Sequence, residues 1–403
     1  MKQQGAGMEI NTGPSQGTAF LQLGFRPFFA GAAVFAIVSI AAWMGVYQHD
    51  WPLVPAGMPA SLWHAHELIF GYALAVIAGF LLAAVKNWTG EQTVQGYSLL
   101  VLFMLWMFAR LAFLASSIVP MQVTAILDIL FLLGVLVAIA IPVVKARQWK
   151  QLGIVSKILL MLIFNGIFYL AVLASDPVLM GQAVYFGLYL VLALIFVMAR
   201  RVIPFFIQNG VDYPAKLKNP LWLDISSLIL FVLFAIFEVL DLSELATGVL
   251  AGLLALLHGI RLFFWYTPGI WKKPLLWVLY LAYSSLVAGF VLSAATAFMG
   301  ISFLLAVHAF TVGGIGLLTL GMMSRVTLGH TGRNVFDPPS GLGVMFALML
   351  AAAIVRVLLP LIDMSRYSIW VAVSQWLWIL AFSLFLLRFL PMLINPRVDG
   401  RPG

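Results

Sequence analysis

The chain has 403 residues, of which 63% are apolar and only 9% are charged, and its formal net charge is +8. Soluble domains contain about 25% charged residues, and disordered chains combine low hydrophobicity with high charge, so both classes are excluded. The absence of cysteine also excludes disulfides, iron–sulfur clusters and thiolate-held zinc, copper or haem, so any metal must depend on His, Met, carboxylate, Tyr or backbone ligands.

About twelve apolar runs follow one another along the chain, and each approaches the ~20 residues that a transmembrane helix needs. They cover residues 28–48, 61–85, 96–117, 120–144, 153–174, 178–199, 222–242, 244–264, 275–296, 300–323, 341–362 and 367–390. The runs are apolar on all sides and show no period-two alternation, which argues against surface helices and against a barrel. We therefore expect an all-α polytopic membrane protein with about 12 transmembrane helices and its longest connection at about 200–221.

The positions of Lys and Arg predict the orientation. All but Arg110, Arg356 and Arg366 of the 22 cationic residues fall in or beside segments on the N-terminal side of the membrane. Because cytoplasmic loops accumulate Lys and Arg, we expect both termini in the cytoplasm. The net positive charge would then face anionic membrane lipid, and nothing in it indicates nucleic-acid binding.

The expected domain organisation has three parts. Residues 1–26 form a cytoplasmic tail without a cleavable signal peptide, residues 27–392 form one transmembrane domain, and residues 393–403 form a cytoplasmic tail. A weak 6+6 repeat over 27–206 and 221–392 is one further interpretation, because segments 25–29 and 201–206 resemble each other.

The second run begins with Trp63-His64-Ala65-His66-Glu67. Ionisable residues inside a membrane are costly, so each is a functional hypothesis. His64 and His66 point about 200° apart on a regular helix, so both reach one metal only if the first turn is irregular. Otherwise they serve two centres, or one is a ligand and the other a hydrogen bonder. The alternative is a solvated cluster at the outer interface.

Two further histidines lie in later runs. His308 is about eight residues from the outer end of its run and hence about 12 Å deep, so a site shared with His66 is geometrically possible. The glycines that follow it suit close helix packing or a flat macrocycle. His258 has Arg261 one turn further on, which fits an axial haem ligand with a cation for a propionate. The alternative is a buried histidine that bonds to a neighbouring helix, beside an arginine that reaches the cytoplasm.

The remaining histidines lie outside the apolar runs. His330 is in the cytoplasmic segment 329–333 with Arg333, where it could bind an anion or a haem edge or end a helix. His49 is beside Asp50 in an outer loop, and we interpret it as a surface residue.

The apolar runs also contain a few charged or ionisable residues besides histidine. Asp128 and Arg110 lie at matching depth in neighbouring runs, which predicts a buried ion pair. Glu67, Tyr72 and Glu238 could belong to a proton path, although the sequence does not order them.

Several segments together resemble one known family. They are 63–67 with Phe70 and Gly71, 25–29, 84–90, 201–206 and above all Arg325-Val326-Thr327-Leu328-Gly329-His330-Thr331-Gly332-Arg333. In these segments, from the first run to the tenth, the chain resembles the NnrS family. The resemblance implies a multi-pass protein of the bacterial inner membrane that contains haem b (one or two) with copper or a second metal. It also implies a link to nitric oxide metabolism and nitrosative stress, often beside denitrification genes.

The resemblance does not settle the chemistry, and our first hypothesis gives the candidate residues roles in an oxidoreductase of the nitric oxide reductase type. Nitric oxide would be bound and reduced to N2O at the outer metal site, with electrons from a quinol or a periplasmic redox protein. The expected metal ligands are His64, His66, His308 and, for an electron-relaying second haem, His258. Further cofactor-binding candidates are Arg26, Arg110, Arg261, His330 and Arg333, and the proton-carrying catalytic candidates are Glu67, Asp128 and Tyr72.

Two other functions remain open at this point. A non-catalytic haem protein that scavenges or senses nitric oxide, or transfers electrons, needs neither a second metal nor a proton path. A transporter also fits twelve helices with both ends inside, but the helix interruptions typical of a midplane substrate site are not evident in the sequence.

Overall fold

The computed structural model describes residues 19–401, so the predicted N-terminal tail is described only from Ala19 onward. Within that range the chain is helical and contains no strand. Twelve helical spans are long and apolar enough to cross a membrane. The prediction of an all-α, twelve-span membrane protein is therefore confirmed.

Several spans are divided into consecutive helical segments. In chain order the segments are η1 (Ala19–Leu21), α1 (Phe25–His49), α2 (Ala60–His66), η2 (Glu67–Ala73), α3 (Leu74–Thr89), α4 (Gly96–Leu114), α5 (Met121–Lys145), η3 (Trp149–Gln151), α6 (Leu152–Ala174), α7 (Pro177–Gly210), α8 (Leu221–Val239), α9 (Glu244–Trp265), η4 (Pro268–Lys272), α10 (Pro274–Met299), α11 (Phe303–His308), η5 (Ala309–Gly316), α12 (Leu317–His330), α13 (Leu342–Val357), α14 (Leu359–Ile362), η6 (Met364–Arg366) and α15 (Tyr367–Ile394).

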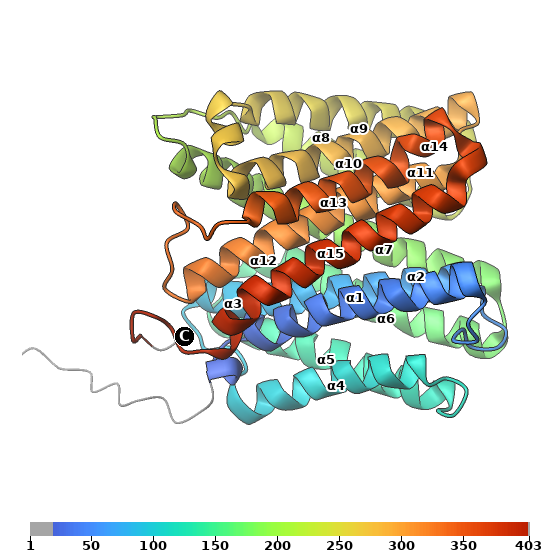
Figure 1. Cartoon of the computed structure of the whole chain (residues 1–403), viewed down its shortest axis with the longest axis horizontal. Helices are drawn as coiled ribbons and strands as arrows, with labels where there is room; N and C mark the ends of the chain where they lie inside the picture. Colours follow the sequence, from blue (N-terminus) through green and yellow to red (C-terminus); the bar gives the residue numbers. More distant parts are fainter. Residues whose placement is uncertain (1–18, 402–403) are drawn as a thin grey trace, which may run out of the picture.

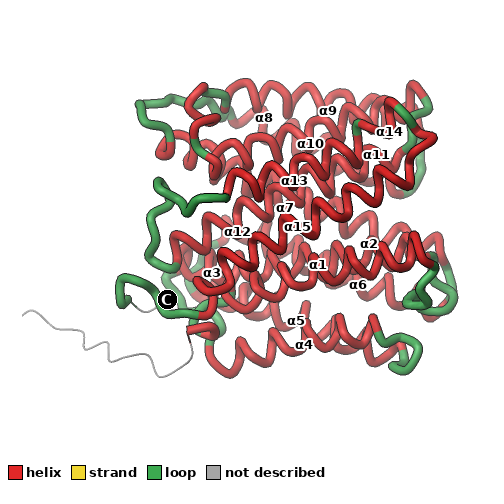
Figure 2. The backbone as a smooth tube through the Cα atoms, viewed as in Figure 1, coloured by secondary structure: helices red, strands yellow, loops and turns green. Residues whose placement is uncertain are grey.

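The helices run side by side, with α4 and α5 along one edge of the molecule and α8 and α9 along the opposite edge (Figure 1). α1 packs against α15, so the first and last spans are neighbours. The connections gather at the two ends of the bundle (Figure 2). We name the end that holds both ends of the described chain the near end, and the opposite end the far end. By the positive-inside pattern, the near end is the expected cytoplasmic side.

The two most buried spans are Ala60–Thr89 and Phe303–His330. Each contains a π-helical segment, η2 in the first and η5 in the second. A π segment is rare and occurs frequently at functional sites. A histidine directly precedes each π segment: His66 precedes η2, and His308 precedes η5. The histidines of greatest interest therefore lie where two central helices depart from regular geometry.

The glycines after His308 serve helix packing. An added Cβ at Gly313 would come within 2.7 Å of Ser285, and one at Gly314 within 2.2 Å of Leu286, both on α10. Of the two interpretations of this glycine strip, the structure therefore favours close contact between helices.

Two helices extend furthest beyond their predicted apolar runs. α7 continues to Gly210 instead of ending near residue 199, and α12 continues to His330, so His330 ends a helix. Hydropathy marks the apolar part of a helix, whereas both extensions contain polar or charged residues, among them Arg200, Arg201, Gln208 and Asn209 in α7 and Ser324, Arg325 and Thr327 in α12. Pro204 lies inside α7 and has no N–H for the carbonyl of Arg200. The side-chain amide of Asn219 donates to that carbonyl at 3.1 Å, which compensates for the missing donor.

Candidate functional site

A cavity of about 360 Å³ lies in the far-end half of the bundle. Segments of α1, α2, η2, α7, α11, η5, α13 and α15 surround it. Most of its wall is apolar; its polar side chains are Tyr47, Ser61, His64, Tyr72, Tyr185, His308, Thr311, Arg356 and Tyr367. Its volume is within the range of about 300–1,000 Å³ that small-molecule and cofactor sites occupy. We refer to it as the far cavity.

His64 enters the far cavity from α2. Its ring stacks on Trp43 of α1, with ring centroids 4.5 Å apart and an angle of 11° between the planes. Its Nδ1 atom is buried and has no hydrogen-bond partner among residues 19–401. A buried polar atom without a partner is unfavourable, so this imidazole retains capacity for a ligand.

His308 enters the far cavity from the end of α11. Its Nδ1 lies 2.6 Å from the carbonyl oxygen of Leu304, which can only accept a hydrogen bond. Nδ1 is therefore the protonated nitrogen, and Nε2 has the lone pair. Metal-ligating histidines commonly have this arrangement, in which one N–H donates to a carbonyl and fixes the orientation of the ring.

Arg356 of α13 faces Nε2 of His308, with Nη2 at 3.2 Å. The same Nη2 donates to the hydroxyl of Tyr367 at 2.8 Å, while Nη1 is buried without a partner within the described part of the chain. Arg356 is not among the site residues that the sequence predicts. The sequence nevertheless distinguishes it, because Arg356 is one of the three cationic residues that depart from the positive-inside pattern.

Tyr72 closes the near-end side of the far cavity. Thr319 donates its hydroxyl hydrogen to the carbonyl of Ile315 at 2.7 Å, so Tyr72 donates to Thr319 Oγ1 at 2.6 Å. Tyr72 also contacts the ring of Trp378 edge to face. This predicted catalytic candidate is thus fixed in place at the cavity wall.

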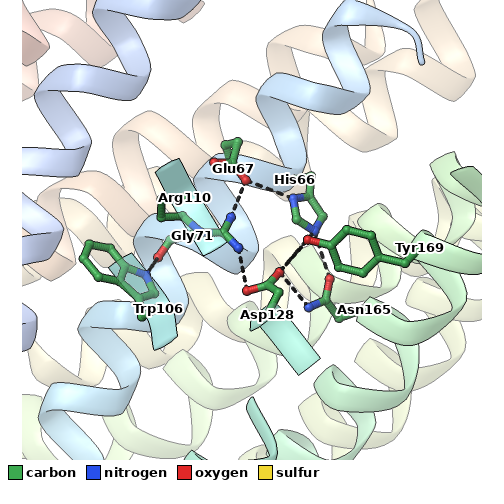
Figure 3. A network of polar contacts seen from close by, with 8 residues as sticks. All are labelled: His66, Glu67, Gly71, Trp106, Arg110, Asp128, Asn165 and Tyr169. Atoms are coloured by element: carbon green, nitrogen blue, oxygen red, sulfur yellow. Dashed lines mark hydrogen bonds and ion pairs between the residues drawn. The ribbon is translucent and has the colours of Figure 1, made fainter. Parts of the chain in front are cut away.

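A second group of polar residues lies beside the far cavity and does not line it. Figure 3 shows the group, which we name the ion network: His66, Glu67, Arg110, Asp128, Asn165 and Tyr169. Arg110 pairs with Glu67 through Nη1 and with Asp128 through Nη2, the latter at 2.5 Å. The predicted Arg110–Asp128 ion pair is therefore present. Asn165 and Tyr169 donate to Asp128 Oδ2 at 3.0 and 2.9 Å.

His66 belongs to the ion network with both ring nitrogens. Nδ1 lies 3.1 Å from Glu67 Oε1, and Nε2 lies 2.9 Å from Asn165 Oδ1. Its ring stacks on Phe168 at 4.2 Å. His64 and His66 therefore point to different groups of residues, as expected for i and i+2 on a regular helix. The structure does not bring His66 together with His308 in the far cavity.

Arg110 approaches η2 closely because residue 71 is a glycine. A Cβ at Gly71 would lie 3.1 Å from Arg110 Cδ and 2.7 Å from the ring of Phe35. The carbonyl of Gly71, within the π segment, accepts a hydrogen bond from Trp106 Nε1 at 2.9 Å (Figure 3). Neighbouring side chains thus satisfy the irregular backbone, as a membrane interior requires.

His258 lies in the near-end half, on α9. Its Nδ1 is 2.6 Å from the hydroxyl of Tyr283, and its ring stacks between Phe196 at 4.4 Å and Phe290 at 5.5 Å. Arg261, one turn further on, pairs with Asp224 of α8 at 2.7 Å. The cavity beside them has a volume of only about 60 Å³, and we name it the near cavity.

Three more candidates lie at the near end, and two of them, Arg26 and His330, link segments from the two ends of the described chain. Arg26 donates from Nη1 to carbonyl groups at the end of α15, at 3.2, 2.9 and 2.8 Å. His330 packs against Phe25 at 5.4 Å, and its carbonyl accepts from Arg397 at 3.0 Å. Arg333 has its Nη1 3.5 Å from the carbonyl of Thr331. The structure brings none of these three into the far cavity.

The sequence model of one protein family, described as NnrS protein, matches residues 19–397. The chain belongs to the NnrS family. It is thus a multi-pass membrane protein of the NnrS family, consistent with a function related to nitric oxide. No curated protein matches the chain.

The side chains of the far cavity are compatible with the haem that the sequence resemblance leads us to expect. It has one imidazole with an unpartnered buried nitrogen, a second imidazole whose tautomer is fixed, and a guanidinium beside the second. A porphyrin supplies four iron ligands itself, so one or two imidazoles are sufficient. Across residues 19–401, no group of three or more His, Asp or Glu side chains could hold a bare metal ion. The near cavity does not fit a second haem, because its volume is small and Arg261 is already paired with Asp224.

Proposed function

We propose that this protein binds nitric oxide at a haem b in the far cavity and reduces it to N2O, in a bacterial inner membrane. The observation that supports this best is the pair His64 and His308 lining one largely apolar cavity of about 360 Å³. Nitric oxide is small, neutral and soluble in lipid, so a site within the membrane needs no charged channel.

Each residue of the site has a proposed role. His308 would be the preferred haem ligand, because the carbonyl of Leu304 fixes its Nδ1–H and leaves Nε2 with the lone pair. Arg356 would then turn from Nε2 toward a propionate, since guanidinium groups pair well with carboxylates. His64 would provide a further ligand for the haem or would hold a second metal such as copper. Bound haem would supply an iron that binds neutral diatomic ligands and accepts and donates single electrons.

Reduction of two nitric oxide molecules to N2O and water consumes two electrons and two protons. A quinol or a periplasmic redox protein would supply the electrons. The described residues lining the far cavity include no Asp or Glu. Protons would therefore reach it through hydroxyl groups such as Tyr72 and Tyr367, while Glu67 and Asp128 interact with Arg110 in the ion network.

The absence of Asp and Glu from the described lining of the far cavity favours a second candidate function. In it, a haem protein binds nitric oxide without turning it over. A scavenger, sensor or electron-transfer partner needs no carboxylate beside its haem. The two candidates differ in one measurable product, N2O.

The test uses the purified full-length protein in detergent. Its optical spectrum and metal content are measured for the wild type and for His308→Ala, His64→Ala and His49→Ala, the last as an exposed control. We expect a Soret band in the wild type and in H49A, and its loss in H308A. Full haem occupancy in H308A would contradict the assignment of His308. N2O produced from nitric oxide by reduced, metal-replete wild type distinguishes the enzyme from the binding protein.

A further inference from the structure

The near cavity lies between α7, α8 and α9, away from the far cavity. Its walls combine apolar side chains such as Phe196 and Phe231 with a polar group of Arg200, Asp224, Ser227, His258 and Arg261. The Arg200 side chain is 38% exposed, whereas that of Arg261 is 3% exposed. The near cavity therefore extends from the near-end surface, at Arg200, to a buried interior.

The charges around the near cavity do not balance. Asp224 bridges two guanidinium groups, with Oδ2 2.8 Å from Arg200 Nη2 and Oδ1 2.7 Å from Arg261 Nη1. Two positive charges thus share one carboxylate, which leaves an excess of one positive charge. Asp224 and Arg261 are buried whereas Arg200 reaches the surface, so the excess positive charge lies toward the mouth of the near cavity, where a bound anion would offset it.

Several hydrogen-bonding atoms beside the near cavity have no partner. Nε2 of His258 is buried and unpaired within residues 19–401, and the residue as a whole is only 1% exposed. The Nε atoms of Arg200 and Arg261 are likewise buried without a hydrogen-bond partner in the described structure. Buried polar atoms are nearly always satisfied by protein, water or ligand. A group of unsatisfied guanidinium N–H donors beside an excess positive charge favours an acceptor that is negatively charged.

The size of the near cavity limits what can bind. One water needs about 10–15 Å³ measured in this way, so about 60 Å³ holds a few water-sized atoms. We propose that the near cavity is a binding site for a small monovalent anion, a halide or an oxyanion of about three or four non-hydrogen atoms. This site is independent of the function proposed for the far cavity.

The test measures the thermal unfolding midpoint of purified protein in sodium gluconate, titrated with chloride, nitrate or formate at constant ionic strength. The wild type should show a saturable rise of the midpoint. Arg200→Gln should weaken the apparent affinity at least tenfold. The matched control is Arg201→Gln, which removes the adjacent, exposed arginine that binds Gln151 and should titrate like the wild type. A wild type without a saturable response, or equal responses in R200Q and R201Q, would overturn the proposal.

Asp224→Asn separates an anion site from a purely structural ion triad. The substitution raises the excess from one positive charge to two, so we expect lower stability in gluconate and a tighter apparent affinity for chloride than the wild type has. A triad without a ligand predicts lower stability that no anion restores, and that result contradicts the proposal. If D224N does not fold, the R200Q and R201Q pair still decides.

Lipid headgroups are the other source of negative charge at the near end. The midpoint is therefore also measured in nanodiscs of phosphatidylcholine alone and with phosphatidylglycerol. A response to free anions in phosphatidylcholine nanodiscs supports the proposal. A response to phosphatidylglycerol without any response to free anions identifies a lipid headgroup as the ligand and overturns it.

Discussion

Replacing Arg110 with Met removes the guanidinium that pairs with both Glu67 and Asp128. The methionine retains an unbranched stem to fill the space beside Gly71, so the change is mainly one of charge. The side chains of all three ionised residues are at most 3% exposed, so solvent does not screen the loss. Leaving buried charge without its partner costs about 3–5 kcal/mol. We expect R110M to lose that much unfolding free energy.

The matched control is the triple variant Arg110→Met, Glu67→Gln, Asp128→Asn, which removes the charges together and retains the shapes of the side chains. Because replacing a whole buried ion network is often close to neutral, the triple variant should recover most of the loss. The assay is reversible unfolding in mixed detergent–SDS micelles, followed by tryptophan fluorescence. A loss below about 1 kcal/mol in R110M, or a triple variant no more stable than R110M, would refute the reasoning.

Three further predictions concern packing and the near end. Gly71→Ala places a Cβ 2.7 Å from Phe35, and the same unfolding assay should show a loss of about 1–3 kcal/mol from overpacking. Arg26→Gln removes charged hydrogen bonds to the end of α15, so the assay should show a loss of about 1.5–3 kcal/mol and trypsin should cleave the C-terminal tail faster. Arg397 hydrogen-bonds to Asp399 and holds the pKa of that carboxyl well below its ordinary range. Because the pKa of Asp399 is lower in the folded tail than in the unfolded one, ionised Asp399 stabilises the folded tail. This stabilisation is complete above the unfolded pKa of about 3.9 and is lost only as the pH falls through the folded-state pKa. Proteolysis of the tail, by a protease active at both values, should therefore be equal at pH 7 and pH 5 in the wild type and faster at both in Asp399→Asn.

Hydropathy and charge predicted the twelve spans because lipid imposes length and apolarity on every one of them. The ion pair Arg110–Asp128 was predictable too, because matching depth in neighbouring spans leaves two opposite charges few other partners. Asn165 and Tyr169 were not predicted. They are uncharged and lie one turn apart in an apolar helix, so only the position of Asp128 in space identifies them as partners.

The candidate site could be predicted only in part. His64 and His308 are conspicuous in the sequence as rare intramembrane histidines, and both line the far cavity. The sequence also grouped His66 with them, but which side of α2 faces which neighbour depends on helix packing that periodicity does not determine. Arg356 was noted as an exception to the positive-inside pattern, yet its contact with His308 joins residues that are 48 positions apart. The π segments had no signal in sequence, because their glycines are equally typical of ordinary helix packing.

Each π segment also divides one of the two most buried spans into a far-end half and a near-end half. A π turn is equivalent to one residue inserted into an α-helix, so everything before it is rotated by about 100° relative to everything after it. Deleting one residue within Glu67–Ala73 would restore a regular helix and swing His64 and His66 by about that angle while α3 kept its contacts. The lengths of η2 and η5 therefore set the direction in which His64, His66 and His308 point relative to the near-end halves of the same helices.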